Sequence, residues 1–380
     1  MRRGTSGINA LIAVDKPAGM TSHDVVARVR RALGERRVGH AGTLDPDATG
    51  VLVVGVGQGT RLMGLLTAER KGYVGLVAFG SETDTEDAAG AVTRVAEPPA
   101  WALDDQRARA CVEGLVGEHD QVPPAYSAIS VGGIRSYARA RAGEQVELAP
   151  RRVTIYDAQL LSVGASVPGV GPGGPGAGAG SDAGSAGASA GTDAGGAGAR
   201  VSGLDGTSDP ACPDASERDR AEAGEGPAAT APAPAAVTWL CSFDVSKGCY
   251  VRSIARDLGR ACESAAHLAG LRRTRSGAVT LGDCVSLDGL EREGARIVAT
   301  RCVDPVRALA LPVRTLGERE AADAANGKSL ALGSVGSVAP CEGDRVALVC
   351  ADRLVGVWKR RGDRLVCDVN FPGGITGVRQ

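Results

Sequence analysis

Residues 164–236 are built almost entirely from Gly, Ala, Ser, Pro, Thr and Asp. They contain no aromatic residue and only four large aliphatic residues, Val167, Val170, Val201 and Leu204. Such a segment cannot bury enough apolar surface to offset its ordering entropy, so we expect it to be disordered. The folded core must therefore come from the residues before and after it.

Two runs typical of β-strands flank this low-complexity segment. Residues 151–163 read RRVTIYDAQLLSV and residues 237–245 read VTWLCSFDV, and both are rich in β-branched and aromatic residues. We therefore expect the segment to be an expanded hairpin loop between two paired strands. A fold can carry such an insertion because the entropic cost of closing a loop grows slowly with its length.

The formal net charge of the chain is −1, which on its own argues against a nucleic-acid partner. The low-complexity segment biases this value, because residues 164–236 hold nine acidic and only three basic side chains. The other residues hold 40 basic and 35 acidic side chains, a net charge of +5. An excess of this size permits RNA binding without demonstrating it.

The chain has ten cysteines and four histidines, without the CxxC pairs of a zinc site. Its basic N-terminus is followed by an apolar run of about six residues, which is too short for the hydrophobic region of a secretory signal peptide. No stretch approaches the ~18 apolar residues of a membrane span. We therefore expect a cytoplasmic protein whose thiols are reduced and serve mostly as small core residues.

The segment GHAGTLDPDATG, residues 39–50, ends just before a run typical of a buried strand, VLVVGVG from Val51. Its glycines allow backbone conformations that other residues rarely adopt, and Pro46 biases Asp45 toward extended geometry. The carboxylate of Asp45 is thus held at the edge of rigid structure, as a nucleophile or a base usually is. The structural alternative is an Asx-type turn, in which Asp45 bonds only its own backbone.

Other patterns predict helices and strands on both sides of the low-complexity segment. Residues 8–17 are typical of a strand, and residues 22–34 of a helix that Thr21 or Ser22 caps and Gly34 ends. The remaining predicted elements are an alternating strand over 73–80, a polar turn over 83–90, a helix over 104–117 with a capping Asp, and a turn that runs into a helix over 246–262.

From about Leu311 the pattern changes to short strands separated by turn signals. The four runs are VGSVAP, DRVALVC, RLVGVWKR and RLVCDVNF. Spacing of this kind indicates a small β-barrel or sandwich. The sequence therefore predicts one domain over residues 1–310, interrupted by residues 164–236, and a second domain over residues 311–380.

Five sequence motifs that occur in the expected order identify a family more specifically than any one of them alone. GHAGTLDPDATG occurs together with KPAGMTS at 16–22, QVPPAYSAISVGGIRSYARARAG at 121–143, SKGCYVRSIARDLG at 246–259 and LRRTRSG at 271–277. Together they resemble the TruB family of bacterial tRNA pseudouridine-55 synthases. The resemblance covers about residues 8–163 and 237–310.

This resemblance implies an α+β catalytic domain with a mixed, mostly antiparallel sheet, flanking helices and a positively charged cleft. For residues 311–380 it implies a PUA-like, RNA-binding β-barrel. The implied activity is isomerisation of a uridine in the T-loop of tRNA to pseudouridine, without cofactor or metal. The implied partner is the T-arm of tRNA, with no guide RNA and no membrane, and we expect a monomer.

The predicted catalytic residues are Asp45, Tyr73 and Arg252. Moving uracil from an N1 to a C5 link requires breaking a C–N bond, turning the base over and forming a C–C bond. A carboxylate suits this task, because it can add to C1′ or C6 or abstract the 2′ proton, and Asp45 is the candidate. By the resemblance, Arg252 is its counter-charge, and Tyr73 stacks on the uracil and handles the C5 or 2′ proton.

The target uridine must leave its stack before it can react, which costs a few kcal/mol. By the resemblance, Tyr73 and Tyr250 contact the extruded uridine, His40 fills or braces the space around it, and Leu271 lines the uracil pocket. Without the resemblance, core packing would account for Leu271 and Tyr73, and a buried structural role would account for His40.

Several arginines are expected to contact the RNA backbone, where contacts position RNA but do not specify it. Specificity for a T-loop would come from its shape and its splayed bases. For Arg30 and Arg31 the structural alternative is a solvated helix face. For Arg252 it is a surface salt bridge. The predicted phosphate contacts are Arg30, Arg31, Arg272, Arg273 and Arg275.

Three other functions stay open at this point. The chain could be an RNA-binding and folding module whose activity is secondary, or a synthase that acts on another RNA uridine. A nucleotide-binding enzyme that uses residues 54–62, VGVGQGTRL, is disfavoured because this segment has neither GxxxxGK nor GxGxxG spacing.

Overall fold

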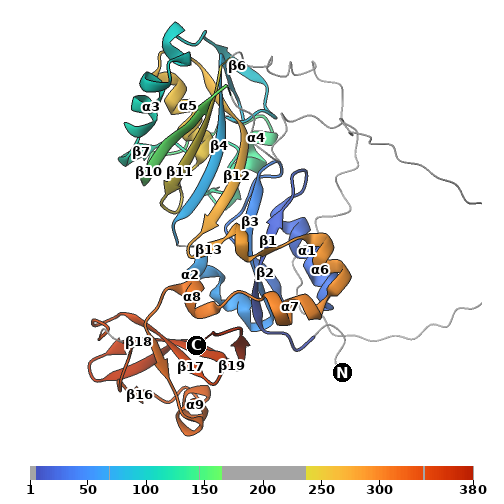
Figure 1. Ribbon diagram of the computed structural model, residues 1–380, viewed down its shortest axis with the longest axis vertical. Helices are drawn as coiled ribbons and strands as arrows, with labels where there is room; N and C mark the ends of the chain where they lie inside the picture. Colours follow the sequence, from blue (N-terminus) through green and yellow to red (C-terminus); the bar gives the residue numbers. More distant parts are fainter. Residues whose placement is uncertain (1–5, 68, 145, 165–236, 337–338, 380) are drawn as a thin grey trace, which may run out of the picture. The chain divides into compact units, whose positions relative to one another are not determined.

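The structure is a computed structural model that describes residues 6–67, 69–144, 146–164, 237–336 and 339–379. Ten of the strands within these residues form one large sheet (Figure 1). They are β1 (Ala10–Lys16), β2 (Val38–Ala41), β3 (Thr49–Val56), β4 (Lys71–Phe79), β7 (Gly117–Gln121), β10 (Arg151–Val163), β11 (Thr238–Val245), β12 (Ala266–Ser276), β13 (Val279–Thr280) and β14 (Cys284–Val285).

The spatial order of the large sheet is β14-β1-β3-β12-β4-β11-β10-β7, with β2 paired to β3 and β13 paired to β12. Only the β1–β14 and β3–β12 pairs are parallel among the described strands of this sheet. The prediction of a mixed, mostly antiparallel sheet is therefore confirmed.

Helices flank this sheet, as predicted, and short helical turns connect its strands. The α-helices before the C-terminal strands are α1 (Ser22–Leu33), α2 (Met63–Thr67), α3 (Asp105–Glu113), α4 (Ser136–Arg141), α5 (Val251–Ala261), α6 (Leu287–Glu293), α7 (Ala295–Arg301) and α8 (Pro305–Leu309). The short turns of 3₁₀-helix are η1 (Gly57–Leu62), η2 (Ala100–Leu103) and η3 (Leu281–Asp283).

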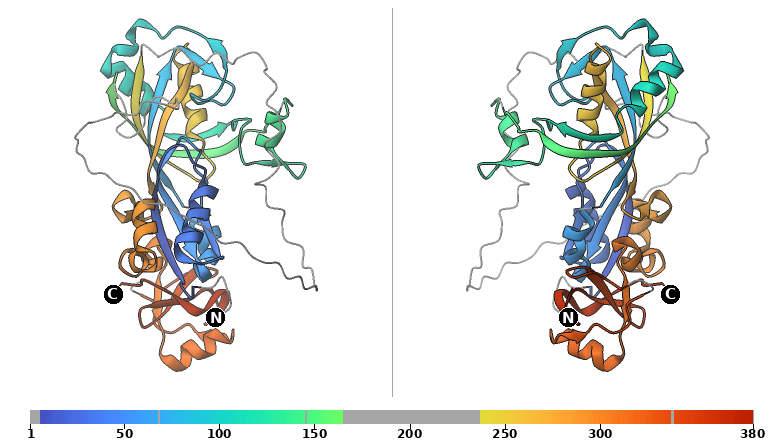
Figure 2. Two further views of the ribbon diagram at one scale, coloured as in Figure 1. Left: turned by 90° about the vertical axis from the view of Figure 1, so that its right-hand side faces the viewer. Right: turned by 90° about the vertical axis from the view of Figure 1, so that its left-hand side faces the viewer.

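Two small hairpins complete this part of the chain. The first pairs β5 (Ser81–Thr83) with β6 (Val92–Val95), and the second pairs β8 (Ser130–Val131) with β9 (Ile134–Arg135). Figure 2 shows α4 and the β8–β9 hairpin set apart from the large sheet.

The strands on either side of the low-complexity segment pair as predicted. Strands β10 and β11 are antiparallel, with Val163 opposite Trp239, and the amide of Gly164 donates to the carbonyl of Thr238 at 2.7 Å. Residues 164–236 were expected to be disordered. Apart from Gly164, this segment lies outside the described residues. The described strands on either side of this segment pair with each other, as a fold that tolerates a long loop between paired strands allows.

Helix α1 begins and ends where its sequence signals predict. Thr21 is the N-cap, and its hydroxyl accepts from the amide of Asp24 while the Asp24 carboxylate accepts from the amide of Thr21. This reciprocal pair is a capping box. Gly34 ends the helix in the left-handed conformation, at φ +60°.

Two core clusters fill the two halves of the sheet. In the first, α3 and α5 pack on β4, β10, β11 and β12, with Trp239 and Phe243 fully or almost fully buried. In the second, α1, α6 and α7 pack on β1 and β3. The first cluster places α5, and with it Arg252, over the middle strands of the sheet.

The C-terminal residues form a separate five-stranded sheet in the order β15-β17-β18-β19-β16. Its strands are β15 (Val313–Thr315), β16 (Leu330–Ala331), β17 (Arg345–Cys350), β18 (Arg353–Arg361) and β19 (Arg364–Thr376), and α9 (Glu318–Ala325) packs beside them. This curled sheet is consistent with the predicted PUA-like fold.

One of the four predicted C-terminal strands is wrong. In the run VGSVAP, Val335, Gly336, Ala339 and Pro340 lie outside any strand, and the other two residues are not described. Gly336 has a positive φ of +47°, which breaks an extended strand. The prediction also missed α9, a short helix rich in alanine.

A third core cluster joins the two sheets. It contains Leu11, Val51 and Val53 from the large sheet together with Val349 and Phe371 from the C-terminal strands. We call it the shared core cluster. Hydrogen bonds cross the same junction, since the Gly373 amide donates to Gln58 and the Thr376 hydroxyl to the Asn9 carbonyl. The predicted boundary at residues 310 and 311 stays a prediction.

Within the described residues, no helix combines the length and the apolar character that crossing a bilayer requires.

Truncating Phe371 tests whether the shared core cluster couples the two sheets. Phe371 is fully buried, so Phe371→Ala should lower the free energy of unfolding by about 3–5 kcal/mol. Because the cluster belongs to both sheets, urea unfolding should remain a single transition at a lower midpoint. Two separate transitions, of which the substitution shifts only one, would contradict this coupling.

Candidate active site

Asp45 lies in the loop between β2 and β3, and neighbours on both sides of it are held in place. The Ser22 hydroxyl accepts from the amide of Leu44 at 2.9 Å and donates to its carbonyl at 3.2 Å. On the other side, the carbonyl of Pro46 accepts from the amide of Gly19 at 3.1 Å. The loop is therefore fixed at the residues next to Asp45.

Arg273 braces the start of the same loop from inside the protein. Its guanidinium donates to the carbonyls of Val51 at 2.7 Å and Gly42 at 3.1 Å, and the side chain is only 1% exposed. The predicted phosphate contact of Arg273 is therefore wrong, because RNA cannot reach this group. Gly50 makes the brace possible: its φ is +103°, and a Cβ there would lie 2.1 Å from the carbonyl oxygen of Arg273.

Lys16 holds the other side of the loop. Its ammonium is buried and donates to the carbonyls of Pro17, Met20 and Pro46 at 2.7–2.8 Å. Burial lowers the pKa of Lys16 to about 8, while the nearby carboxylates of Asp47 and Asp45 oppose this shift. The KPAGMTS motif is thus tied to the loop of Asp45.

The carboxylate of Asp45 meets the guanidinium of Arg252 at two points. Arg252 Nε lies 3.0 Å from Oδ2, and Arg252 Nη2 donates to Oδ1 at 3.2 Å. The side chain of Asp45 is 43% exposed, whereas that of Arg252 is 7% exposed. Within the described residues the carboxylate pairs with Arg252 and not with its own backbone, so a simple Asx turn does not describe it.

Arg252, near the start of α5, has three further acceptors. Nη1 donates to the carbonyl of Thr85 at 2.9 Å and to the Asp87 carboxylate at 3.4 Å, and Nη2 donates to the carbonyl of Tyr126 at 3.0 Å. Burial raises the pKa of Asp87, and the charge of Arg252 opposes this rise. The guanidinium is therefore oriented by groups other than Asp45.

Tyr250 stands immediately before α5, on the same side of the molecule as this pair. The amide of Tyr250 donates to Gln121 Oε1 at 2.8 Å, and Gln121 Nε2 donates to the carbonyl of Tyr250 at 3.1 Å. Burial raises the pKa of Tyr250, and the charges of Arg252 and Asp45 also act on it. The structure thus brings Asp45, Arg252 and Tyr250 within electrostatic reach of one another.

Tyr73 and Leu271 lie on the neighbouring central strands β4 and β12. Tyr73 is opposite Arg273 in the register, and Leu271 is opposite Gly75. Both side chains are partly buried and pack against the first core cluster. Within the described residues the Tyr73 hydroxyl has no hydrogen-bond partner. Packing accounts for the buried, apolar part of both side chains.

His40 lies on β2, three residues after the arginines that follow α1. Its Nδ1 is buried without a hydrogen-bond partner among the described residues, and its ring contacts His23 edge-on at 5.4 Å. Burial, helped by the positive charges of His23 and Arg273, lowers the pKa of His40 to about 4. The ring is therefore neutral at physiological pH.

The other predicted phosphate contacts differ in how accessible they are. Arg30 and Arg31 are exposed at the end of α1. Arg272 is partly buried and pairs with Asp15 at 2.7 Å, and Arg275 pairs with Asp244 at 2.8 Å. To contact a phosphate, Arg272 and Arg275 would each have to release its carboxylate partner or bind the phosphate in addition to it.

A groove lined by cations lies beside Tyr250. Its volume is about 400 Å³, and we call it the cationic groove after Arg151, Arg152 and Lys247. Arg152 is paired with Glu118 and Asp120, whereas Arg151 and Lys247 have no ion pair among the described residues. Gly248, which also lines the groove, lies two residues before Tyr250 in the chain.

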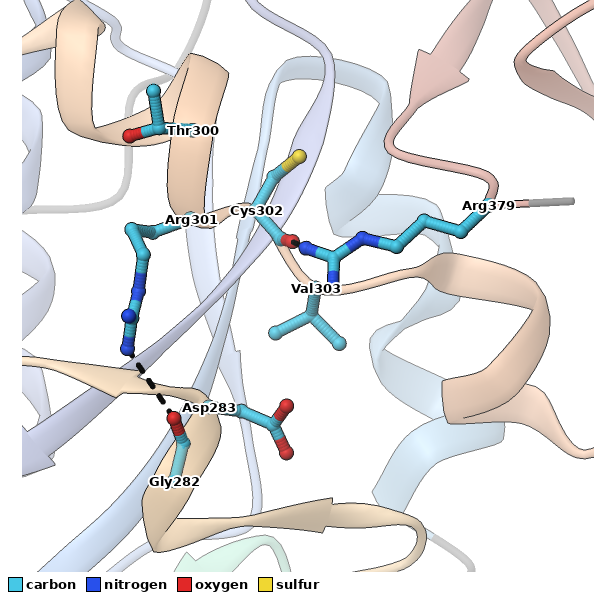
Figure 3. A pocket seen from close by; sticks show the side chains of 7 residues that line it. All are labelled: Gly282, Asp283, Thr300, Arg301, Cys302, Val303 and Arg379. Atoms are coloured by element: carbon cyan, nitrogen blue, oxygen red, sulfur yellow. Dashed lines mark hydrogen bonds between the residues drawn. The ribbon is translucent and has the colours of Figure 1, made fainter.

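Another cavity, of about 230 Å³, contains none of the predicted site residues (Figure 3). Arg301 donates to the carbonyl of Gly282, and Arg379 donates to the carbonyl of Cys302, both at 3.2 Å. Main-chain carbonyls therefore engage both guanidiniums.

Taken together, the site offers a half-exposed carboxylate, a fixed counter-charge and the nearby phenol of Tyr250. Such a group can act as a nucleophile or as a base toward a ligand that enters from solvent. No group of three or more His, Cys, Asp or Glu side chains among the described residues is arranged to hold a metal ion.

Sequence reasoning missed three residues that support this site: Asp87, Lys16 and Gln121. Asp87 lies in the predicted polar turn over 83–90, and no local pattern connects it to an arginine 165 residues later. Lys16 and Gln121 are the first residues of two of the quoted motifs. Their position in those motifs was the available signal, but their contacts depend on the fold.

The neutral state of His40 predicts a pH dependence of stability. Between pH 6.5 and about pH 4 the unfolded chain binds a proton at His40 that the folded protein does not bind. The free energy of unfolding should therefore fall as the pH is lowered through this range, by about 1 kcal/mol per pH unit from this group. Urea unfolding at several pH values should show a shallower slope for His40→Asn, and an unchanged slope would contradict the assignment.

Two sequence families match the chain. Residues 30–167 match the family described as "TruB family pseudouridylate synthase (N terminal domain)". Residues 252–316 match the family described as "tRNA pseudouridylate synthase B C-terminal domain". The matched ranges include Asp45, Tyr73 and Arg252.

Relatives named tRNA pseudouridine synthase B match over most of their length. That of Deinococcus radiodurans is 37% identical over 355 residues, which cover 92% of this chain and 99% of the relative. That of Thermobifida fusca is 38% identical over 336 residues, which cover 87% of this chain and 91% of the relative.

Solved structures with a similar fold include two that are about 20% identical in sequence. A structure of an "H/ACA RNP bound to a substrate RNA containing 2'-deoxyuridine" has a TM-score of 0.57 at 19% identity and covers 97% of this chain and 86% of that chain. An "archaeal box H/ACA sRNP Nop10-Cbf5 complex" has a TM-score of 0.56 at 21% identity, and the match covers 95% of this chain and 85% of that chain. At these identities the likeness concerns the fold. The sequence matches show more: the chain belongs to the TruB family of pseudouridine synthases, which isomerise uridine in RNA to pseudouridine.

Proposed function

We propose that this chain converts uridine 55 in the T-loop of tRNA to pseudouridine, with Asp45 as the reacting carboxylate. The observation that carries the proposal is the two-point contact between half-exposed Asp45 and buried Arg252. The names of the relatives from Deinococcus radiodurans and Thermobifida fusca support tRNA as the substrate. The position within the T-loop rests on the family resemblance.

Asp45 can serve the reaction in three ways. It can add to C1′ of the ribose, add to C6 of the uracil, or abstract the 2′ proton. Each route frees the base to turn over so that C5 instead of N1 bonds to C1′. None of them requires a cofactor or a metal.

Arg252 can keep its orientation while Asp45 reacts. Its contacts with Thr85, Asp87 and Tyr126 do not involve Asp45. Because Asp45 is half exposed, its carboxylate can turn toward a bound uridine while the guanidinium stays in place. A fixed positive charge of this kind stabilises negative charge without reorganisation during the reaction.

Tyr73, Tyr250, His40 and Leu271 are proposed to hold the extruded uridine. Aromatic faces recover part of the energy that unstacking costs. Tyr73 is the candidate for stacking and for handling the C5 or 2′ proton, and its hydroxyl has no competing partner within the described residues. The neutral ring of His40 can fill space beside the nucleotide without adding charge.

The RNA backbone is proposed to lie along exposed arginines and the cationic groove. Arg30 and Arg31 are exposed, and Arg151 and Lys247 have no ion pair within the described residues. Cations without a protein counter-charge are free to replace the counterions of phosphates. The proposed ligand is the T-arm of tRNA, which is recognised by its shape and its splayed bases.

Residues 1–310 are proposed as the catalytic domain and residues 311–380 as a PUA-like domain that binds RNA. The H/ACA structures with a similar fold are complexes with RNA or with other proteins. For this chain we propose action as a monomer in the cytoplasm without a guide RNA. Conversion of a tRNA transcript by the purified protein alone tests whether the protein acts without a guide RNA.

The alternative function is an RNA-binding and folding module, which the cationic groove and the C-terminal sheet favour. A synthase that acts on another RNA uridine is the alternative within the same chemistry. Both alternatives are outcomes of the experiment that follows.

Asp45→Asn should abolish pseudouridine formation and leave tRNA binding within about twofold, because the amide keeps the shape but loses the nucleophile. The measurement is incubation of an unmodified tRNA transcript with each protein, followed by site-resolved pseudouridine mapping and a binding assay. Product at the T-loop uridine with the wild type only is the expected result. Turnover by Asp45→Asn would contradict the role of Asp45, and product at another uridine would contradict the proposed position.

A further inference from the structure

Glu86 combines two features that the proposed reaction does not use. Its backbone has a φ of +62°, in the left-handed region that favours glycine, and its side chain is buried. A charged residue in such a conformation persists only where its surroundings determine it. Glu86 therefore has contacts strong enough to fix both its backbone and its carboxylate.

The backbone of Glu86 is bonded outside α5, since its amide donates to the carbonyl of Thr83 at 3.1 Å and its carbonyl accepts from the amide of Leu268 at 3.0 Å. The contacts of its carboxylate are all on α5, the helix that carries Arg252. The Ser253 hydroxyl donates to Glu86 Oε2 at 2.7 Å, and Arg256 Nη1 donates to Glu86 Oε1. Ser253 follows Arg252 directly, and Arg256 lies one helical turn after Arg252. The carboxylate of Glu86 thus binds the turn over residues 83–90 to the first two turns of α5.

The two residues beside Glu86 are acceptors of Arg252. The carbonyl of Thr85 and the carboxylate of Asp87 both accept from Nη1. A movement of Glu86 along α5 would carry both acceptors with it. The turn is tied to Leu268 of β12 by main-chain hydrogen bonds on both sides of Asp87, and to α5 by the carboxylate of Glu86. The tie to α5 therefore sets how the two acceptors lie relative to Arg252.

Arg256 extends the same brace to the third acceptor of Arg252. Its Nη2 donates to the carbonyl of Val122 at 3.1 Å, four residues before Tyr126. The carbonyl of Tyr126 accepts from Arg252 Nη2. One buried ion pair, Glu86 with Arg256, thus connects α5 to both segments that orient Arg252.

We infer that Glu86 is a positioning residue for the reaction: its carboxylate holds the turn over residues 83–90 on α5 so that Arg252 presents two nitrogens to Asp45. The inference rests on the proposed function. Removal of the charge leaves Asp257 as the carboxylate partner of Arg256 among the described residues. It removes the tie between the turn and α5, while the hydrogen bonds of the turn to Leu268 remain. The contact between Arg252 and Asp45 is loosened as a result.

Glu82 provides a matched control. It is a buried carboxylate near the same turn, and it also pairs with an arginine of α5, Arg260, at 2.7 Å. Arg260 lies two helical turns beyond Arg252, and neither Glu82 nor its neighbours accept from Arg252 among the described contacts. Glu82 pairs with Arg94 as well, at 2.7 Å, and both of its arginine partners are more exposed than Arg256. Loss of its charge tests the effect of neutralising a buried, paired carboxylate without moving the acceptors of Arg252.

The experiment compares Glu86→Gln, Glu82→Gln and wild type in the full chain. Single-turnover rates on saturating unmodified tRNA should fall by at least about 10-fold in Glu86→Gln and by less than about twofold in Glu82→Gln. The dissociation constant for tRNA should stay within about twofold in both. Glu86→Gly, which relaxes the left-handed backbone, should lose rate in the same way if the glutamine variant folds poorly.

A double-mutant cycle separates positioning from general stability. In an Asp87→Asn background, Glu86→Gln should cost less than about twofold, because both act on the same guanidinium. Full additivity, equal rate losses in Glu86→Gln and Glu82→Gln, or an unchanged rate in Glu86→Gln would overturn the inference.

Crystal structures of the two variants give a readout that does not depend on turnover. Arg252 should lose its two-point contact with Asp45 in Glu86→Gln and keep it in Glu82→Gln. An intact contact in Glu86→Gln would contradict the inference whatever the activity. A wild-type protein without activity on tRNA would instead contradict the proposed function.

Discussion

The guanidinium of Arg252 lies buried among acceptors that come from separate parts of the chain. Asp45, Thr85, Asp87 and Tyr126 all contact it, and the first two are separated by 40 residues in sequence. A buried charge of this kind is costly unless every one of its donors finds a partner. Removing one partner of a buried ion pair typically costs about 3–5 kcal/mol. The loops around the site must therefore fold together with α5, and the geometry of Asp45 depends on all of them.

The loop of Asp45 is fixed in a complementary way by two buried cations, Lys16 and Arg273. Lys16 and Arg273 donate to main-chain carbonyls on both sides of Asp45, and each lies in a different strand. Because Lys16 and Arg273 donate to main-chain carbonyls, the carboxylate of Asp45 pairs only with Arg252 among the described residues. The result is a rigid backbone that carries one half-exposed carboxylate, which is the arrangement a nucleophile or base toward RNA requires.

Much of this fold could be predicted from the sequence. Caps and hydrophobic patterns predicted α1 and α3, and the strand-like runs beside the low-complexity segment predicted the β10–β11 pair, because these signals act over a few residues. The C-terminal sheet was predicted less well, since the strand expected at VGSVAP is absent from its described residues and α9 was missed. Asp45 and Arg252 were expected to pair and do so. The burial of Arg273 and the contacts of Asp87 and Glu86 could not be predicted, because they depend on which strands and turns the fold brings together.

The most direct test of this mechanism is the single-turnover rate of Arg252→Lys on unmodified tRNA, with Arg260→Lys as the control. Lysine keeps the positive charge but cannot supply two planar nitrogens to a carboxylate. If the two-point contact positions Asp45, the rate of Arg252→Lys should fall by at least about 100-fold, or about 2.7 kcal/mol, with unchanged tRNA affinity. Arg260→Lys, which alters a similar contact with Glu82, should stay within about twofold of wild type. A rate for Arg252→Lys within about threefold of wild type would show that charge alone suffices, and would contradict a central role for the geometry of the Arg252 guanidinium.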